Sequence, residues 1–445
     1  EEYSYGAVKG LETLIKENDL SFKNAKEVVH ATTVATNTVL EGKGAKTALI
    51  TTKGFRDVLE IMRANRPDMY NLKVKKPSPF VPRKLRFEIS ERVSFEGDIV
   101  EPLNLNELNE ILVQCQDNKV EAIAIQFMHS YLFTEHEKEC AKYIKQKFPE
   151  VSITLSSDIT REWREFERAN TAVLNAYVQP IVSNYFKNLE KKLKQIGLNC
   201  TLTAMQSNGG TTSFNWAKEH PITLVESGPA AGVNGAVLVG ELCNKKNIIY
   251  FDVGGTTTKC ALIEEGKPKV TTEYKLEYTK FNPGYPIRVP VTDLVEIGAG
   301  GGSIAWFDTG GSLKVGPKSA GADPGPASYN KGGEEPTITD AKLVTGVINP
   351  QNFASGQFDL RKDLAEKAIA KIAKGLNVDL VSAASSIVRV AEANMINALK
   401  LVSIQRGYDP RDFVLVAGGG GGWSSEIIKA PSISNSFYKT KVKNN

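Results

Sequence analysis

The stretch YFDVGGTTTKCALI, from Tyr250 to Ile263, places a carboxylate and a polar turn of glycine and threonine between two apolar segments. The apolar segments predict two strands. Adjacent glycines allow backbone conformations closed to other residues and let a ligand approach the amides, while threonine hydroxyls add donors without charge. The turn therefore suits a phosphate group, although a tight hairpin favours the same glycine pair.

Asp252 stands at the end of the first apolar segment. A carboxylate only accepts hydrogen bonds, so it repels phosphate unless a cation lies between them. Mg²⁺ bound through one carboxylate and the oxygens of a substrate phosphate is such an arrangement. The stretch predicts either a Mg²⁺–nucleotide site with Asp252 as the metal ligand or a plain hairpin.

Other glycine-rich turns occur in SNGGTTS, GAGGGS and AGGGGG, which begin at Ser207, Gly298 and Ala417. The P-loop pattern fails because Lys259 follows a threonine, and the dinucleotide pattern fails because Ser303 and Trp423 stand at its third glycine. Several separate glycine turns at strand ends suit a nucleotide held in a cleft between two lobes.

The composition is that of an ordinary soluble globular protein, with 41% hydrophobic residues and a net charge of +4 from 55 basic and 51 acidic residues. The charges are spread along the chain, so we expect no nucleic-acid partner. The five cysteines form no CxxC pair, and no apolar run approaches the roughly 20 residues needed to span a membrane. We expect a cytoplasmic protein without a membrane segment.

Strand-like and helix-like segments alternate along the chain, which predicts an α/β fold with parallel strands. Thr134 and Glu137 fit a capping box that starts a helix. A long amphipathic stretch from about Asn170 to Gln195 predicts a helix that is broken at Pro180.

The chain as a whole resembles the hydantoinase A / 5-oxoprolinase family, within the actin, sugar-kinase and Hsp70 ATPase superfamily. The resemblance rests on the stretches HATTVATNTVLEGKGAKTALITTKGFRDVLEI, RANRPDMYNL, VPRKLRFEISERV, VESGPAAGV, FDVGGTTTK, PVTDLVEIGAGGGSIAW, GPKSAGADPGPASY and VAGGGGG. It implies a two-lobed actin-like (ribonuclease H-like) ATPase fold with an inserted or preceding α/β domain. Residues 1–180 would form the hydantoinase A N-terminal type domain, and residues 181–445 the ATPase domain. We expect a first Asp-x-Gly-Gly-Thr loop to be missing upstream, and the C-terminus to be incomplete.

Carried over by position, the resemblance assigns Mg²⁺ to Asp252 and ATP to the glycine turns. The residues implied to hold phosphates or adenosine are Gly254, Gly255, Thr256, Thr257, Gly298, Gly300, Gly301, Gly302, Gly418, Gly419 and Gly420. The alternative is a set of flexible turns. Lys259 departs from the aspartate that is commoner in the family, and it would either contact phosphate or point to solvent.

A second group of candidates lies in the first domain, where HATTVATN gathers polar side chains that could meet a substrate amide. His30, Thr33 and Asn37 are the candidate catalytic residues beside Asp252, and a helix N-cap is the alternative interpretation.

Two further stretches each fit both a functional and a structural interpretation. Arg63, Asn65, Arg66 and Asp68 fit either an anion site or a surface salt-bridge cluster. Asp323, before Pro324, fits either a turn or a cleft residue.

The resemblance implies that ATP phosphorylates a carbonyl oxygen of a small cyclic amide, a lactam or imide, before ring opening. An ATP-dependent ketone carboxylase and a nucleotide-operated scaffold of the actin/Hsp70 type are the alternatives. No hydrolytic apparatus is recognisable in the sequence, so a hydantoinase B-like subunit is the expected partner in a hetero-oligomer.

Overall fold

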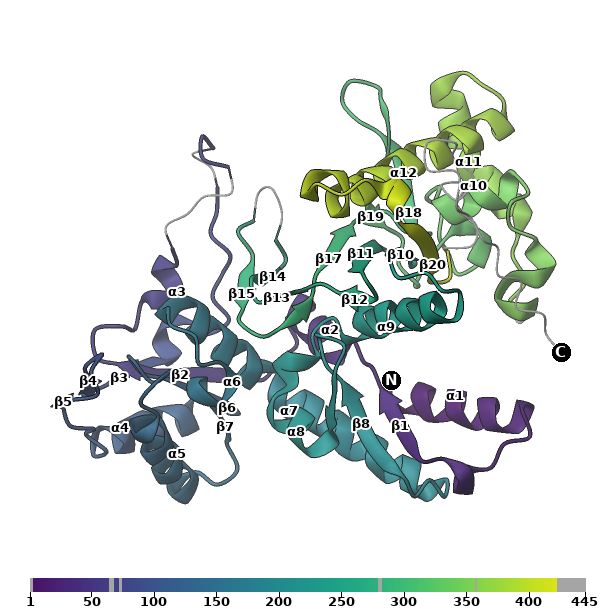
Figure 1. Ribbon diagram of the computed structural model, residues 1–445. Coiled ribbons are helices and arrows are strands. Elements are labelled where there is room, and N and C mark those ends of the chain that lie inside the picture. The colour runs from purple at the N-terminus through teal and green to yellow at the C-terminus, as the bar shows by residue number, and fades with distance from the viewer. Residues whose placement is uncertain (1–2, 64–67, 72–73, 279–281, 357, 422–445) are drawn as a thin grey trace. The chain divides into compact units, whose positions relative to one another are not determined.

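The computed structural model describes residues 3–63, 68–71, 74–278, 282–356 and 358–421 (Figure 1). The chain divides into two compact units. Unit 1 comprises Glu1–Ala231 and Val270–Thr292, and unit 2 comprises Gly232–Lys269 and Asp293–Asn445. The boundary expected at residue 180 lies inside a helix of unit 1; it concerns the domain types of the family and stays a prediction.

Unit 1 holds eight α-helices in the described part of the chain, and a ninth begins there and continues in unit 2. They are α1 (Tyr3–Glu17), α2 (Val34–Leu40), α3 (Val58–Ile61), α4 (Glu107–Asp117), α5 (Glu135–Lys147), α6 (Ser156–Ile159), α7 (Glu165–Gln195), α8 (Phe214–Glu219) and α9 (Ser227–Leu242). Its strands are β1 (Glu27–His30), β2 (Thr47–Thr52), β3 (Arg86–Ile89), β4 (Arg92–Val93), β5 (Ile99–Glu101), β6 (Ala122–Gln126), β7 (Ser152–Leu155), β8 (Thr201–Met205), β9 (Thr211–Ser213), β13 (Val270–Thr271), β14 (Tyr274–Leu276), β15 (Tyr285–Ile287) and β16 (Val291–Thr292).

The predicted parallel sheet is present in unit 1, with the strand order β3-β2-β6-β7. Every residue of β2 and β6 is buried, because helices cover a parallel sheet on both faces. A second sheet has the order β1-β8-β9, in which β1 and β8 are parallel and β8 and β9 form a hairpin.

Helix α7 is continuous, so the break predicted at Pro180 is wrong. A proline inside a helix costs about 3 kcal/mol or more, because it donates no backbone hydrogen bond and crowds the preceding turn. Most of α7 is buried, with α1, α2 and α8 and the strands β6 and β7 packed around it. This packing holds the helix together through the proline.

Helix α5 begins where the sequence predicts, but the capping box is absent. The Thr134 side chain makes no cap hydrogen bond, and Glu137 turns into the interior instead. Its carboxylate accepts hydrogen bonds from the Phe127 amide at 3.1 Å and from the hydroxyls of Ser156 and Ser157 at 2.6 and 2.7 Å. Buried donors therefore compete successfully for the carboxylate that the capping box would use.

Unit 2 is built around the sheet β12-β11-β10-β20, with β17 also paired to β11. Its strands are β10 (Ile248–Val253), β11 (Thr258–Glu264), β12 (Lys267–Pro268), β17 (Leu294–Ile297), β18 (Ser303–Phe307), β19 (Leu313–Ser319) and β20 (Val414–Gly418). Its further helices are α10 (Ile338–Val344), α11 (Lys362–Leu376) and α12 (Leu380–Val402).

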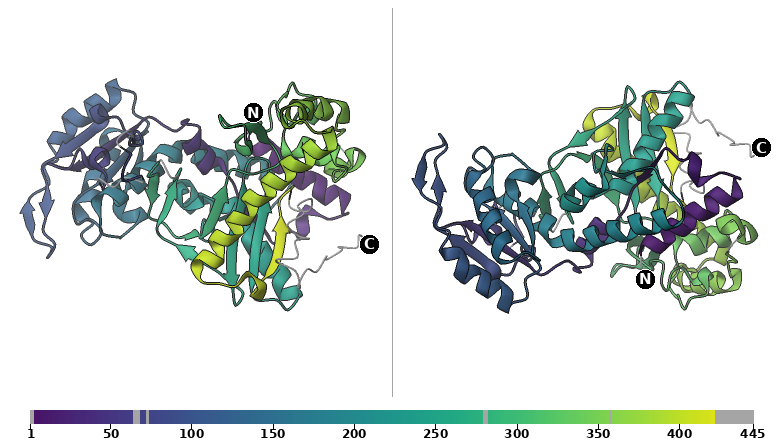
Figure 2. Two further views of the ribbon diagram at one scale, coloured as in Figure 1. Left: turned by 90° about the horizontal axis from the view of Figure 1, so that it is seen from above. Right: turned by 90° about the horizontal axis from the view of Figure 1, so that it is seen from below.

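The strand β10 shows how this sheet is covered on both faces. Side chains alternate along a strand, so Ile248 and Tyr250 pack in a cluster with α9, whereas Ile249 and Phe251 pack in the core that includes α10, α11 and α12. Figures 1 and 2 show α12 lying across one face of the strands. The predicted strand pair around Asp252 thus lies in the middle of a layered α/β unit.

Candidate functional site

The Gly-Gly-Thr-Thr segment of unit 2 forms the turn between the antiparallel strands β10 and β11, which we call the 254–257 turn. The Gly254 amide closes it with a 3.0 Å hydrogen bond to the Thr257 carbonyl. Among the described residues, the amides of Gly255, Thr256 and Thr257 have no acceptor. Gly255 and Thr256 are exposed and Thr257 is half-buried, so three neighbouring donors remain available to a ligand.

The 298–303 loop, which follows β17, packs against this turn backbone to backbone. The amides of Gly301 and Gly302 donate to the carbonyls of Gly254 and Gly255 at 3.0 and 2.6 Å. A Cβ on Gly300 would lie 2.6 Å from the carbonyl carbon of Thr256 and 2.7 Å from its nitrogen, closer than real contacts allow. These glycines therefore support the 254–257 turn and commit two of their amides to it.

The third predicted segment, the 418–421 turn, follows β20, which runs parallel to β10 and pairs Gly418 with Asp252. Gly419 has a φ of 74°, a conformation that favours glycine, and a Cβ there would overlap an Asp252 carboxylate oxygen and the Val253 carbonyl. The Gly421 amide donates to the Val253 carbonyl at 2.9 Å. Glycine is thus required beside the carboxylate.

A cavity of about 160 Å³ joins the three segments in unit 2. Its lining residues are Val253, Gly254, Gly255, Gly301, Gly302, Gly321, Pro326, Tyr329, Ile338, Thr339, Lys342, Ile348, Phe353, Met395, Gly420 and Gly421. The predicted set thus contributes Gly254, Gly255, Gly301, Gly302 and Gly420 to the lining. Asp252, Thr256, Thr257, Gly298, Gly300, Gly418 and Gly419 lie in the same segments but do not line the cavity.

The wall that faces the glycines was missed by sequence reasoning. It comes from α10, from α12 and from the loops on either side of α10, and it is mainly apolar and aromatic. No phosphate-like pattern marks these segments in the sequence, and only the fold brings them to the turns. The GPKSAGADPGPASY stretch supplies part of this wall, but Asp323 itself is exposed and is not a lining residue.

Asp252 is half-buried and is paired in register with Lys259 on β11 and Gly418 on β20. Burial and then the negative charge of Asp252 raise the pKa of the nearby Tyr250 hydroxyl, which therefore stays neutral. The described residues contain no group of three or more His, Cys, Asp and Glu side chains placed to hold a metal. A lone carboxylate beside open amides fits Mg²⁺, which commonly keeps several waters and binds through one or two carboxylates and phosphates.

Lys259 does not extend into solvent, which corrects one interpretation of this residue. Its ammonium forms a 2.7 Å ion pair with Glu296 on the neighbouring strand β17 and donates to the Thr257 hydroxyl at 3.3 Å. The side chain is only 17% exposed. Lys259 therefore braces the end of the 254–257 turn.

In unit 1, the HATTVATN segment runs from the end of β1 into α2. His30 Nε2 lies 2.7 Å from the Tyr185 hydroxyl, and burial lowers the pKa of His30 to about 4. His30 is therefore neutral at physiological pH. Burial also raises the pKa of Tyr185, against a hydrogen bond to Thr32 that lowers it.

The remaining polar groups of this segment divide into two sets. Thr32 and Thr36 are buried and bond to the VESGPAAG segment: the Thr32 amide donates to Ser227 Oγ at 3.1 Å, and the Glu226 amide donates to Thr36 Oγ1 at 3.3 Å. Thr33 is exposed and Asn37 half-buried, and the Asn37 amide group donates to Thr33 Oγ1 at 3.3 Å. Thr33 precedes α2 without a side-chain cap bond, so the N-cap interpretation does not describe its hydroxyl.

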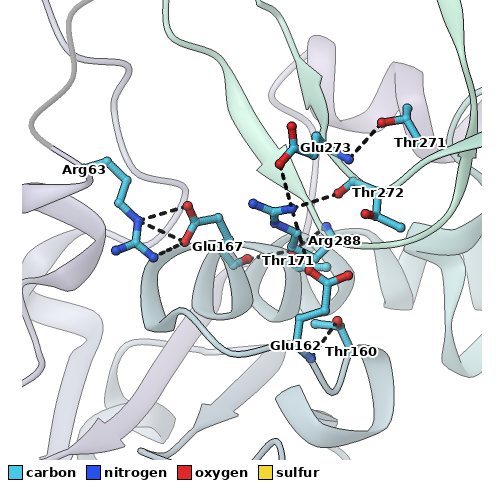
Figure 3. A network of polar contacts seen from close by, with 9 residues as sticks. All are labelled: Arg63, Thr160, Glu162, Glu167, Thr171, Thr271, Thr272, Glu273 and Arg288. Atoms are coloured by element: carbon cyan, nitrogen blue, oxygen red, sulfur yellow. Dashed lines mark hydrogen bonds and ion pairs between the residues drawn. The ribbon is translucent and has the colours of Figure 1, made fainter.

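The RANRPD candidates are only partly described. Asn65 and Arg66 lie outside the described residues, and Asp68 is half-buried. Arg63 forms a two-pronged ion pair with Glu167, with its closest contact at 2.6 Å (Figure 3). Burial opposes ionisation of Glu167, but this hydrogen bond and the charge of Arg63 hold its pKa below the usual value.

Figure 3 also shows a second arginine of unit 1 in the same network. Arg288 lies 3.6 Å from Glu162 and 3.9 Å from Glu273, and its amide donates to Thr171 Oγ1 at 2.9 Å. Arg63 and Arg288 are thus both paired with carboxylates of the chain. The anion-site and salt-bridge interpretations of the RANRPD stretch both stay predictions.

Known proteins resemble the chain along nearly its whole length. The hydantoinase/oxoprolinase family matches residues 168–434, and the hydantoinase/oxoprolinase N-terminal region matches residues 1–148. The chain belongs to the hydantoinase/oxoprolinase family. The resemblance stated from the sequence motifs is thereby confirmed.

A protein of Methanocaldococcus jannaschii is 43% identical to this chain, over 94% of this chain and 62% of its own length. Caprolactamase subunit alpha of Pseudomonas jessenii is 33% identical, over 88% of this chain and 56% of its own. A nucleotide-free structure of acetone carboxylase, solved in work on ATP-dependent acetone carboxylation, is 26% identical with a TM-score of 0.81, over 97% of this chain and 62% of its own. The chain thus spans 56 to 62% of the length of these relatives.

The similarity to these proteins and the layers of helices and strands in the structure confirm the predicted fold class, a two-domain α/β fold of the ATPase type. In the part of the chain that the structure describes, no helix is both long and apolar enough to cross a membrane.

Proposed function

We propose that the chain binds Mg²⁺–ATP in unit 2 and belongs to an enzyme that phosphorylates a carbonyl oxygen of a lactam or imide before ring opening. One observation carries the nucleotide part of this proposal. Three glycine segments that are far apart in the sequence line one cavity, and the 254–257 turn leaves three adjacent amides without an acceptor among the residues that the structure describes. Open amides at a strand end form a cradle for an anion such as phosphate.

In this proposal, each part of the 254–257 turn has its own task. The amides of Gly255, Thr256 and Thr257 and the threonine hydroxyls hold phosphate oxygens, and Asp252 holds the Mg²⁺. The metal, when bound, neutralises the charge that develops on the transferred phosphoryl group. The 298–303 loop and the 418–421 turn fix the position of this turn and of Asp252, since their backbones are bonded to it or packed against it.

The substrate side is proposed to include the HATTVATN segment of unit 1. Thr33 and Asn37 present a hydroxyl and a carboxamide on the accessible side of α2, and these groups can pair with the N–H and C=O of a cyclic amide. Because His30 is neutral, it can donate or accept a hydrogen bond but supplies no positive charge to a developing oxyanion.

A ketone carboxylase is the second candidate, because a methyl ketone presents the same kind of oxygen to ATP and a carboxylase is among the similar structures. In either case, we propose a hydantoinase B-like partner subunit. The alpha designation of the caprolactamase relative supports a multi-subunit assembly.

The test is ADP release and product formation with 5-oxoproline, hydantoin, N-methylhydantoin, caprolactam and acetone, with and without bicarbonate. The full chain is assayed alone and with its candidate partner. Stimulation by a cyclic amide without bicarbonate supports the amidohydrolase, and stimulation by acetone that requires bicarbonate supports the carboxylase. If only unfolded peptides or polymerisation stimulates turnover, the chain is a nucleotide-operated scaffold and the proposal is wrong. Full product formation by the chain alone, at a rate that the partner does not change, would contradict the need for a partner.

A further inference from the structure

The cavity of unit 2 has two walls, and the one that faces the glycine segments is assembled from separate pieces of the chain. Pro326 and Tyr329 belong to the loop before α10, which we call the 326–329 segment, and Ile338 and Thr339 belong to the first turn of α10. Residues 330–337 separate these pieces along the chain. Tertiary contacts must therefore fix how the two pieces lie in the wall.

The side chain of Asp340 on α10 makes these contacts. One carboxylate oxygen, Oδ1, accepts a hydrogen bond from the Ser328 amide at 2.8 Å, and the other, Oδ2, accepts one from the Ala327 amide at 3.2 Å. Oδ2 also accepts from the amide and the hydroxyl of Thr337, at 3.1 and 2.8 Å, within the capping box that starts α10. One carboxylate thus binds four donors from the two pieces of the wall.

The burial of Asp340 shows how much depends on these four donors. The residue is 0% exposed, and a carboxylate withdrawn from water is costly unless hydrogen bonds replace its hydration. An ionised carboxylate has about four acceptor sites, so it can satisfy all of these donors at once. A carboxamide has one oxygen and would turn its own N–H groups towards some of them. The arrangement therefore requires the carboxylate.

The residue before Asp340 ties α10 to the glycine wall of the cavity. The amide and the hydroxyl of Thr339 both donate to the Gly301 carbonyl, at 2.8 and 2.9 Å. The Gly301 amide in turn donates to the Gly254 carbonyl at 3.0 Å. A continuous series of bonded residues therefore leads from the glycine wall through α10 to Asp340, and from its carboxylate to the 326–329 segment.

We propose that Asp340 is a positioning residue of the nucleotide site, whose carboxylate holds the 326–329 segment at a fixed distance from the glycine wall. Asp340 does not line the cavity itself, so it acts through the residues that do. The inference rests on the proposed function, since it requires a nucleotide in this cavity. A wall that is already in place does not have to be ordered when the ligand binds, and this favours affinity.

Hydrogen–deuterium exchange of the full chain tests the positioning, and isothermal titration calorimetry with ADP tests its consequence. Asp340→Asn keeps the size of the side chain but not its four acceptor sites. Thr337→Val removes the hydroxyl of the capping box and leaves the bonds from Asp340 to the 326–329 segment in place. Asp379→Asn makes the same substitution at the exposed N-cap of α12 and is the matched control. Thermal unfolding shows whether each variant folds.

We expect Asp340→Asn to speed exchange of the Ala327 and Ser328 amides and to weaken ADP binding about tenfold, the size typical of a lost hydrogen bond to a charged group. Thr337→Val and Asp379→Asn should leave both the exchange of these amides and the ADP affinity unchanged. These two variants separate the link between the wall pieces from the capping of a helix.

If Asp340→Asn does not fold, Ala327→Pro tests the same link by removing a single donor. Ala327 is the first residue of a 3₁₀ turn and follows Pro326, whose backbone is extended at φ −52° and ψ 148°, so a proline fits there. We expect a loss of ADP affinity of about threefold, because the other donors to the carboxylate remain. Unchanged ADP affinity in folded Ala327→Pro would overturn the inference.

Three further results would contradict the proposal in different ways. Faster exchange with unchanged ADP affinity in folded Asp340→Asn would leave Asp340 with a structural role only. Unchanged exchange of the Ala327 and Ser328 amides would show that the carboxylate does not hold the segment. An equal loss of ADP affinity in Thr337→Val would assign the effect to the helix cap. If the unaltered chain binds no ADP, the proposed function fails and the inference falls with it, whatever the exchange shows.

Discussion

Two hairpins in this chain carry the sequence Gly-Gly-Thr-Thr, and their turns use their backbone amides in different ways. In unit 1, the turn between β8 and β9 is closed from within: the Gly209 amide donates to the Gln206 carbonyl at 3.0 Å, and the Gly210 amide donates to the Asn208 side chain at 2.9 Å. In unit 2, the turn between β10 and β11 leaves the amides of Gly255, Thr256 and Thr257 without acceptors in the described part of the chain.

The residue before the glycine pair accounts for part of this difference. Asn208 lies inside its turn and caps a glycine amide, whereas Val253 precedes the other glycine pair and Asp252 stays in the strand. The surroundings account for the rest, since among the described residues a second glycine loop packs against the carbonyls of the 254–257 turn and none packs against those of the other turn. A glycine–threonine hairpin is thus a candidate anion site only where its amides remain open and something else holds its shape.

The largest expected effect comes from removing the carboxylate beside the open turn. Asp252→Ala should lower Mg²⁺-dependent ATP turnover by about three orders of magnitude, because a metal at a phosphoryl group stabilises the transition state by several kcal/mol. The measurement is steady-state ADP release, with circular dichroism to show that the variant is folded. Asn208→Ala in the closed turn is the matched control and should leave turnover unchanged. Normal turnover by Asp252→Ala would show that Asp252 takes no part in turnover, and the proposed functional difference between the two hairpins would then be wrong.

A smaller loss is expected when the support of the open turn is disturbed. A methyl group on Gly300 would overlap the backbone of Thr256 and Thr257, whereas one on Gly255 meets no atom within 4 Å. Gly300→Ala should therefore weaken ATP binding about tenfold to a hundredfold by displacing the turn, and Gly255→Ala should have a much smaller effect. Equilibrium binding of ATP to both variants measures this. Equal affinities would show that the packing of the second loop does not position the first.

The sequence predicted the part of this site that depends on local chemistry. The strand pair, the turn and the separate glycine segments follow from residues that are adjacent in the chain, such as Gly254 and Gly255. The opposite wall does not, because Lys342 lies in a segment whose residue types fit any amphipathic helix, and Tyr329 ends the GPKSAGADPGPASY stretch, which carries only a family resemblance. Tertiary packing alone brings them to the turn.

Contacts between residues that are far apart in the sequence also explain the wrong and the missed predictions in unit 1. Glu137 fits a capping box by its spacing, but the serines that bind it lie 19 and 20 residues further on. Ser227 meets Thr32 across 195 residues, so its contact with the HATTVATN segment is not readable from local pattern. The VESGPAAG stretch was recognised only as a family signature, and this was the one available signal.

The sheet that contains the closed hairpin leads to a prediction about the free energy of unfolding, not about ATP turnover. His30 lies in this sheet, on β1, opposite Ala204 of β8, and its pKa falls from 6.5 in the unfolded chain to about 4 in the folded protein. The unfolded chain therefore binds the proton more readily, so folding stability is full above pH 6.5 and is lost as the pH falls towards 4. The shift corresponds to roughly 3 kcal/mol across that range.

Urea unfolding at several pH values tests this, with His30→Gln as the comparison, because glutamine keeps a polar group near Tyr185 but does not titrate. The stability of the unaltered chain should fall more steeply between pH 6.5 and 4 than that of the variant. Parallel curves would show that His30 is protonated equally well in the folded and unfolded states, and burial would then not be its dominant influence.

The smallest expected effect concerns Lys259, which follows the open turn and has no counterpart in the closed one. Its ion pair with Glu296 is partly exposed, so Lys259→Met should cost only about 0.5 to 1 kcal/mol of stability. ATP turnover should change less than about threefold, because a side chain held by Glu296 and Thr257 contributes to the shape of the turn and not to binding phosphate.

Glu296→Gln distinguishes bracing of the turn from phosphate binding, because it removes the carboxylate that pairs with the ammonium but keeps the lysine. If Lys259 binds phosphate, turnover will fall at least tenfold in Lys259→Met and will be maintained or increased in Glu296→Gln, since the carboxylate of Glu296 then no longer competes with the ligand for the ammonium. If Lys259 only braces the turn, the two variants will show similar small losses, and the open amides of the backbone will account for the difference between the hairpins.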